Sequence, residues 1–78
     1  MTEKIRTFKW LQNNLKTGYI AMNKDRKWHW FSRKPVLNDK LDCWLSSNNS
    51  TVELYKIFKI KPLKNWKESL YECGKTDL

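Results

Sequence analysis

Apolar residues near the start of the chain recur at helical spacing. The positions three or four apart are Ile5, Phe8, Leu11 or Gln12, and Leu15. Thr2 can cap the first turn of such a helix, and Gly18 stands where it would end. The pattern therefore predicts a helix over residues 3–16. A strand over residues 5–11 is the alternative, because a threonine and two aromatic residues favour extended backbone there without alternating cleanly.

Two runs rich in aromatic and apolar residues follow, at 19–22 and 27–32, separated by the turn-forming residues 23–26. This order predicts an antiparallel hairpin. In its second strand Trp28 and Trp30 share one face. The other face carries Lys27, His29 and Phe31. The pattern leaves open which face is buried, since a shift of one residue in register exchanges the two sets.

Pro35 interrupts the hairpin because proline has no amide hydrogen to donate, and a connecting segment over 35–40 follows. A third strand is expected over 42–46, with Trp44 on the face opposite Cys43 and Leu45. Residues 46–50 are all Ser or Asn and predict a loop. Alternating apolar residues over 51–61 then predict a fourth strand, bulged near Lys56.

The last predicted element is a short helix over residues 66–72. Asn65 can cap it, with Glu68 three positions on as the capping-box partner, and Gly74 can close it. The expected fold class is α+β: a small antiparallel sheet of three to four strands, an N-terminal helix and a short C-terminal helix. A chain of 78 residues has room for a single small domain, 1–78, with a thin core.

Positive charge is concentrated in the first part of the chain. The net charge of the protein is +8, and residues 1–34 carry seven of these charges, through nine Lys and Arg against Glu3 and Asp25. The later basic residues are nearly balanced by acidic ones. Such asymmetry, mixed with aromatic rings, is typical of a surface that binds phosphates or an acidic protein. The candidate partner-binding residues are Lys24, Arg26, Lys27, Trp28, Trp30, Phe31, Arg33 and Lys34.

Each of these assignments has a structural alternative. Alternate large aromatic residues on a strand usually belong to a core, so Trp28 and Trp30 are expected to form the inner face of the sheet. In that register Phe31 points outward and becomes the exposed ring available for contact. The basic residues can equally be a solubilising surface.

Catalysis and metal binding have little support in the sequence. His29 is the only histidine, no nucleophile and base are marked by local spacing, and no glycine-rich phosphate loop is present. We therefore expect no enzyme, no metal site and no cofactor. Cys43 and Cys73 are thirty residues apart and are expected to be free thiols, with a disulfide as the alternative.

Residues 1–6 have no apolar run of the signal-peptide kind, and no apolar stretch in the chain is long enough to span a bilayer. The expected location is the cytosol, and no membrane partner is expected.

Three segments resemble small phage-encoded proteins of unknown function. They are Gly18-Tyr19-Ile20-Ala21, Phe31-Ser32-Arg33-Lys34-Pro35-Val36 and Trp66-Lys67-Glu68-Ser69-Leu70-Tyr71-Glu72. The resemblance covers residues 18–72 in outline and transfers no catalytic or binding motif. It implies an accessory protein, and it makes stoichiometric inhibition of a host defence complex, as by anti-CRISPR proteins, the expected role in the host cytosol.

The leading hypothesis is thus a non-enzymatic phage-type protein that binds an acidic protein surface or a nucleoprotein effector complex of the host. Direct DNA or RNA binding in phage replication or transcription is the alternative, and it predicts affinity that falls steeply with salt. Capture of a nucleotide messenger and self-association through exposed aromatic residues are weaker possibilities.

Overall fold

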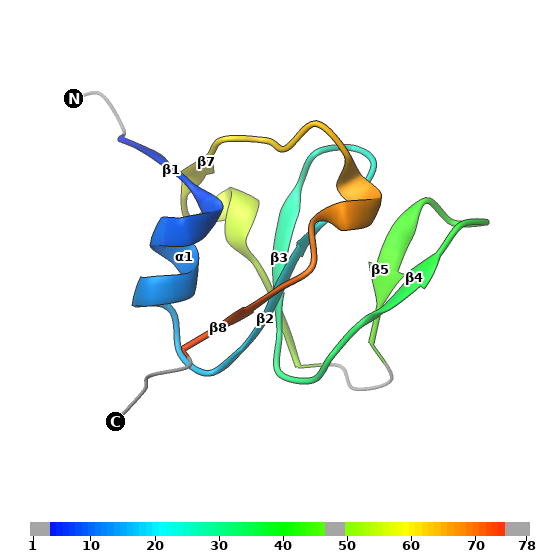
Figure 1. The fold of residues 1–78 in the computed structure, drawn as a ribbon, viewed down its shortest axis with the longest axis horizontal. Coiled ribbons are helices and arrows are strands. Elements are labelled where there is room, and N and C mark those ends of the chain that lie inside the picture. The colour runs from blue at the N-terminus through cyan, green and yellow to red at the C-terminus, as the bar shows by residue number, and fades with distance from the viewer. Residues whose placement is uncertain (1–3, 47–49, 75–78) are drawn as a thin grey trace.

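A four-stranded antiparallel sheet forms the middle of the fold, with strand order β6-β3-β2-β8 (Figure 1). The computed structural model describes residues 4–46 and 50–74. The four strands are β2 (Gly18–Met22), β3 (Trp28–Phe31), β6 (Thr51–Glu53) and β8 (Tyr71–Cys73). The two central strands are the predicted hairpin, which pairs Tyr19 with Phe31 and Met22 with Trp28.

Different elements cover the two faces of this sheet. Helix α1 (Phe8–Asn14) packs on one face. The hairpin of β4 (Val36–Asn38) and β5 (Cys43–Leu45) packs on the other, together with the 3-10 helix η2 (Trp66–Glu68). A second 3-10 helix, η1 (Leu54–Lys56), follows β6. Strand β1 (Ile5–Arg6) pairs in parallel with β7 (Lys59–Ile60) beside α1.

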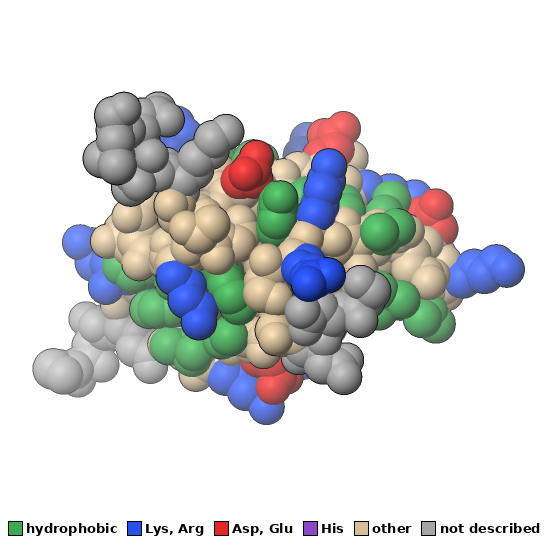
Figure 2. All heavy atoms as spheres, turned by 90° about the horizontal axis from the view of Figure 1, so that it is seen from below, with side chains coloured by type: hydrophobic (Ala, Val, Ile, Leu, Met, Phe, Trp, Pro, Cys, Tyr) green, Lys and Arg blue, Asp and Glu red, His purple; other side chains and the backbone are tan. Residues whose placement is uncertain are grey.

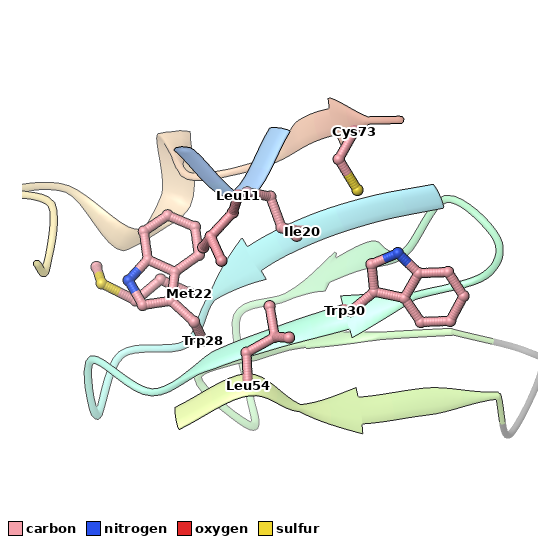
Figure 3. Packing of buried hydrophobic residues seen from close by; sticks show 7 residues of the cluster. All are labelled: Leu11, Ile20, Met22, Trp28, Trp30, Leu54 and Cys73. Carbon is pink, nitrogen blue, oxygen red and sulfur yellow. The ribbon is translucent and has the colours of Figure 1, made fainter. Parts of the chain in front are cut away.

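The larger core lies between the sheet and α1. Its buried members are Leu11, Ile20, Met22, Trp28, Trp30, Leu54 and Cys73. In Figure 3 the two indole rings of β3 lie on either side of Leu11 and Ile20. The inward orientation of Trp28 and Trp30, which the alternation on this strand favoured, is confirmed.

The opposite face of the sheet is buried as well. Ala21 and Phe31 pack there against Trp44 of the β4–β5 hairpin. The expectation that Phe31 is an exposed ring is therefore wrong, and only 3% of its surface is accessible. The sheet is a middle layer, so turning one face of β3 inward does not turn the other toward solvent.

The prediction of an α+β fold with a four-stranded sheet is confirmed, but the N-terminal helix is shorter than predicted. It begins at Phe8, because the Thr7 hydroxyl accepts a hydrogen bond from the Trp10 amide and caps the first turn. Residues 5 and 6, expected in the helix, are drawn into β1 by their pairing with β7. The proposed cap at Thr2 lies outside the described residues.

The predicted C-terminal helix over 66–72 is wrong. Asn65 does cap a turn, through a hydrogen bond from the Lys67 amide, but only the 3-10 helix η2 forms. Residues 71–73 are instead strand β8, antiparallel to β2. Between them, fully buried Ser69 accepts a hydrogen bond from the Met22 amide (2.8 Å), and its hydroxyl lies 3.0 Å from the Met22 carbonyl oxygen.

The middle of the chain also differs from the prediction. The third strand forms as β5, but it pairs with β4, which lies within the segment expected to be a connection. The fourth strand, predicted over 51–61, is divided into β6, η1 and β7. The predicted loop over 46–50 falls largely outside the described residues. Both cysteines are free, as predicted, with Cys73 buried and Cys43 partly exposed.

Candidate anion-binding surface

The turn between β2 and β3 carries three of the candidate basic residues. Lys24, Arg26 and Lys27 lie on a loop closed by hydrogen bonds from the Asn23 amide to the Lys27 carbonyl (3.1 Å) and from the Arg26 amide to the Asn23 carbonyl (2.9 Å). Asp25 fixes the turn by accepting from the Lys27 amide at 3.0 Å. The backbone of Arg26 is left-handed, with φ of 69°, and its side chain points into solvent.

A tyrosine lies beside this turn. The ammonium nitrogen of Lys27 is 5.0 Å from the centre of the Tyr55 ring, and that of Lys56 is 6.0 Å from the same ring. His29 packs edge-on against Tyr55, with 5.4 Å between ring centres. We call Lys24, Arg26 and Lys27 of the turn, together with Lys56, the turn-end cluster; Lys27 and Lys56 lie over the Tyr55 ring.

Acidic groups neutralise part of the turn-end cluster. Lys24 forms an ion pair with Asp42 (3.5 Å), and Lys56 forms one with Glu53 (3.2 Å). The Tyr55 hydroxyl donates to Glu53 at 2.6 Å. This hydrogen bond, with help from Lys56, lowers the pKa of Glu53, and the same bond raises the pKa of Tyr55. Arg26 and Lys27 are the cations of this cluster that form no ion pair within the described part of the chain.

The remaining basic candidates lie at the other end of the hairpin. The register that pairs Tyr19 with Phe31 brings the residues before β2 and those after β3 to the same end. Arg33 and Lys34 are exposed there, and neither forms an ion pair among residues 4–46 and 50–74. Lys16 joins them, with its ammonium nitrogen 4.8 Å from the Trp30 ring centre. We call Lys16, Arg33 and Lys34 the open-end cluster.

The candidate residues thus form two groups. Six residue steps separate Lys27 from Arg33, and at about 3.3 Å for each step of extended chain the two clusters lie roughly 20 Å apart. Figure 2 looks onto the open end and shows separate Lys and Arg side chains distributed over it, with hydrophobic and acidic side chains between them.

The three aromatic candidates do not contribute exposed surface. Trp28, Trp30 and Phe31 are 1%, 6% and 3% accessible. The Trp30 indole N–H donates a hydrogen bond to the Lys16 carbonyl oxygen at 3.2 Å. Base stacking on these rings would require the core to open, so the charged residues, with Tyr55, make up the surface that a partner can reach.

Sequence reasoning missed Tyr55 and Lys56 as neighbours of the hairpin turn. The signal in the sequence is the break of alternation at Lys56, which by itself predicts a bulge. That break is the 3-10 helix η1, and it brings the Tyr55 ring beside the ammonium groups of Lys27 and Lys56.

Other kinds of site receive no direct support from the described residues. Within residues 4–46 and 50–74, no three His, Cys, Asp or Glu side chains gather as metal ligands would. No helix in the described part of the chain has the length and apolar character needed to cross a membrane. Comparisons of the chain with protein-family models, curated proteins and solved structures found no match.

Proposed function

We propose that this protein is a non-catalytic binding module that docks onto an extended anionic surface of a macromolecular partner. The observation that carries the proposal is the pair of basic clusters at opposite ends of the β2–β3 hairpin. The open-end cluster in particular has three cations, and no acidic group in the described parts of the chain is ion-paired with them. Unpaired surface charge of one sign steers association with a partner of the other sign.

The separation of the clusters bears on the size of the partner. A single nucleotide cannot reach groups about 20 Å apart along a strand, whereas a macromolecular surface can. This favours a macromolecule over the nucleotide messenger considered among the weaker possibilities. The burial of the tryptophans also removes the stacking platforms that sequence-tolerant binding of single strands uses.

The identity of the partner as a host defence complex rests on the resemblance of residues 18–72 to small phage-encoded proteins. In this proposal the protein occupies an acidic surface, or the nucleic-acid channel, of a nucleoprotein effector complex in the host cytosol. Stoichiometric occupation needs charge and shape only, which a chain of 78 residues can provide.

The test is a matched pair of charge-reversal variants. One carries Arg26→Glu, Lys27→Glu, Arg33→Glu and Lys34→Glu. The control carries Lys40→Glu, Lys59→Glu, Lys61→Glu and Lys64→Glu, four exposed lysines outside both clusters, so that its net charge is the same. Binding to labelled polyglutamate, duplex DNA, single-stranded DNA and RNA is measured by fluorescence anisotropy at low and physiological salt.

We expect the cluster variant to lose binding to at least one of these polyanions by more than about tenfold, while the control stays within about threefold of the wild type. Equal losses in both variants would mean that net charge alone drives binding, and the proposal would fail. It would also fail if the wild type bound none of the polyanions.

Direct nucleic-acid binding is the second candidate, favoured by the guanidinium groups of Arg26 and Arg33, which suit phosphate and form no ion pair with any residue that the structure describes. Direct binding predicts a specific salt dependence. The logarithm of the association constant for duplex DNA should fall linearly with the logarithm of the salt concentration, with a slope set by the number of phosphates contacted. Preference for polyglutamate over every nucleic acid at physiological salt would exclude this candidate.

A further inference from the structure

The two edges of the central sheet are not alike. At β8, the carbonyl of Glu72 accepts a hydrogen bond from the Gln12 side chain at 2.8 Å, and the Gly74 amide donates to the Gln12 carbonyl at 2.9 Å. Helix α1 therefore closes this edge. At β6, the other edge, Thr51 and Glu53 are exposed to solvent.

The hydrogen-bond pattern shows which groups β6 presents. The Ser32 amide donates to the Ser50 carbonyl at 3.1 Å, so the alternation of an antiparallel ladder assigns the next hydrogen-bonded pair to Trp30 and Val52. The backbone groups of Thr51 and Glu53 then point away from β3.

As the N-cap residue of η1, Glu53 uses its carbonyl for the first hydrogen bond of that helix. The backbone groups of β6 that still point outward are the N–H and C=O of Thr51 and the N–H of Glu53. Within residues 4–46 and 50–74 no group bonds to these three. Strand β6 is an open edge, and such an edge can pair with another extended chain.

A groove runs beside this edge, on the side of the sheet that α1 covers. Its volume is about 360 Å³, and its apolar walls are formed by Leu15, Trp30, Val52, Leu54, Ile57 and Phe58. Ile57 is 60% exposed, so much of this wall meets water. The Lys16 side chain, which also lines the groove, brings a positive charge over the Trp30 ring.

We propose that the β6 edge and this groove bind an extended segment of a partner protein in which apolar residues alternate with acidic ones. The proposal deepens the proposed function and rests on it in requiring an anionic partner. A strand added to β6 places the residue opposite Val52 on the groove side, because opposed residues in a sheet share a face. Its apolar side chain fills the groove. The neighbouring carboxylates point to the other face of the sheet, that of His29 and Glu53, where the ammonium groups of Lys27 and Lys56 lie over the Tyr55 ring.

Two other occupants fit less well. Nucleic acid offers phosphates and sugars to a groove whose walls are apolar, so burying Ile57 and Trp30 against it would gain little. A second copy of this chain would bring two molecules of net charge +8 together at their basic ends, and this repulsion opposes pairing.

The probe is a fluorescent peptide of alternating valine and glutamate, about nine residues long, titrated by anisotropy at physiological salt. Three comparison peptides replace valine by serine, replace glutamate by lysine, or carry N-methyl groups on alternate amides. The protein variants are Ile57→Glu, which places a carboxylate in the groove, and the control Val36→Glu, at a site 70% exposed on β4 and away from the groove.

We expect the valine–glutamate peptide to bind at least about tenfold more tightly than each comparison peptide, because each lacks one of the three interactions. Ile57→Glu should weaken this binding by about tenfold or more, and Val36→Glu should leave it unchanged. In the complex, hydrogen exchange at the Thr51 and Glu53 amides should slow by more than about tenfold.

Other outcomes overturn the inference. Binding of polyglutamate that is no weaker than binding of the alternating peptide would reject the groove while sparing the proposed function, whereas failure to bind any polyanion would reject both. Duplex DNA that displaces the peptide and shifts the NMR signals of Ile57 and Val52 would make nucleic acid the occupant. If the wild type sediments as a dimer and Ile57→Glu as a monomer, the occupant of the groove is a second copy of this chain.

Discussion

Gly18 lies directly against the indole ring of Trp30: a methyl group at position 18 would come within 2.6 Å of two carbons of that ring. It would also lie 2.6 Å from the carbonyl oxygen of Phe31. The absence of a side chain at the start of β2 is therefore what lets the ring fold over the strand. We expect Gly18→Ala to lower the free energy of unfolding by about 1–3 kcal/mol, as overpacking does in cores, measured by urea titration.

A double-mutant cycle with Trp30→Phe separates the ring contact from the backbone contact. The smaller phenylalanine ring relieves the overlap with the side chain at position 30 but not the overlap with the Phe31 carbonyl oxygen. Gly18→Ala should therefore lower the free energy of unfolding by less in the Trp30→Phe background than in the wild type. An equal loss of unfolding free energy in the two backgrounds would show that the indole ring is not what excludes a side chain at position 18.

Ser69 bonds to β2 through its side chain two residues beyond the last β2–β8 pair, Ile20 with Tyr71. Its hydroxyl serves both the amide and the carbonyl of Met22 and also lies 2.6 Å from the Trp66 carbonyl oxygen. Ser69→Ala leaves buried backbone groups without partners, and each such group costs about 1–3 kcal/mol. We expect a loss of unfolding free energy in this range, by chemical denaturation.

Ser32→Ala is the matched control for Ser69→Ala. The Ser32 hydroxyl is also buried but has no hydrogen-bond partner in the described structure. Its removal should be neutral or slightly stabilising, since no bond is lost. Equal destabilisation by the two serine substitutions would contradict the role assigned to Ser69.

The two thiols should differ in reactivity. Burial raises the pKa of Cys73, whose sulfur also lies 3.5 Å from the Lys16 carbonyl oxygen, while Cys43 is partly exposed. A disulfide-exchange reagent should label one thiol rapidly and the second only at the rate of opening of the core. The fast phase should vanish in Cys43→Ser and persist in Cys73→Ser. Two equally fast thiols would argue against the burial of Cys73.

The hydrogen bond from Tyr55 to Glu53 gives a pH dependence at acid pH. Because the bond lowers the pKa of Glu53 in the folded protein, the stabilisation is complete above the ordinary pKa of a glutamate. It is lost as the pH falls through the lowered value. In Tyr55→Phe the Glu53 carboxyl should titrate closer to its ordinary range, as followed by carbon NMR. An unchanged Glu53 titration would leave Lys56 as the main cause.

The local patterns in the sequence identified what short segments can determine by themselves. The β2–β3 hairpin followed from two aromatic runs and a turn, and the inward face of Trp28 and Trp30 followed from their size. The cap at Asn65 was also correct. These features depend on neighbours a few residues away, which a single sequence displays.

The errors arose where distant segments compete for the same residues. Tyr71 and Cys73 fit the end of a helix locally, but as β8 they pair with β2, and Cys73 is buried in the core against α1. The sequence around Phe31 predicts exposure because Trp44, which covers the ring, is thirteen residues away and belongs to another hairpin. Tertiary contacts decided these positions, and alternation alone could not.

The candidate site was predicted in part. All five basic candidates are exposed, but their division into two clusters follows from the length of β3. The apolar groove and the open edge of β6 had no counterpart in the sequence pattern, since the groove combines residues from three separate stretches of the chain, 14–16, 30 and 52–58.

The closed edge at β8 has a consequence for how the chain reaches this structure. Gln12 is hydrogen-bonded to Glu72, 60 residues later in the sequence, and to Gly74, and β1 is paired with β7. The buried residues of the larger core run from Leu11 to Cys73, so contacts that are far apart in sequence must form together. Proteins dominated by such pairings fold in milliseconds to seconds, more slowly than helical bundles. We expect a single cooperative folding transition in which the first and last elements become ordered at the same time.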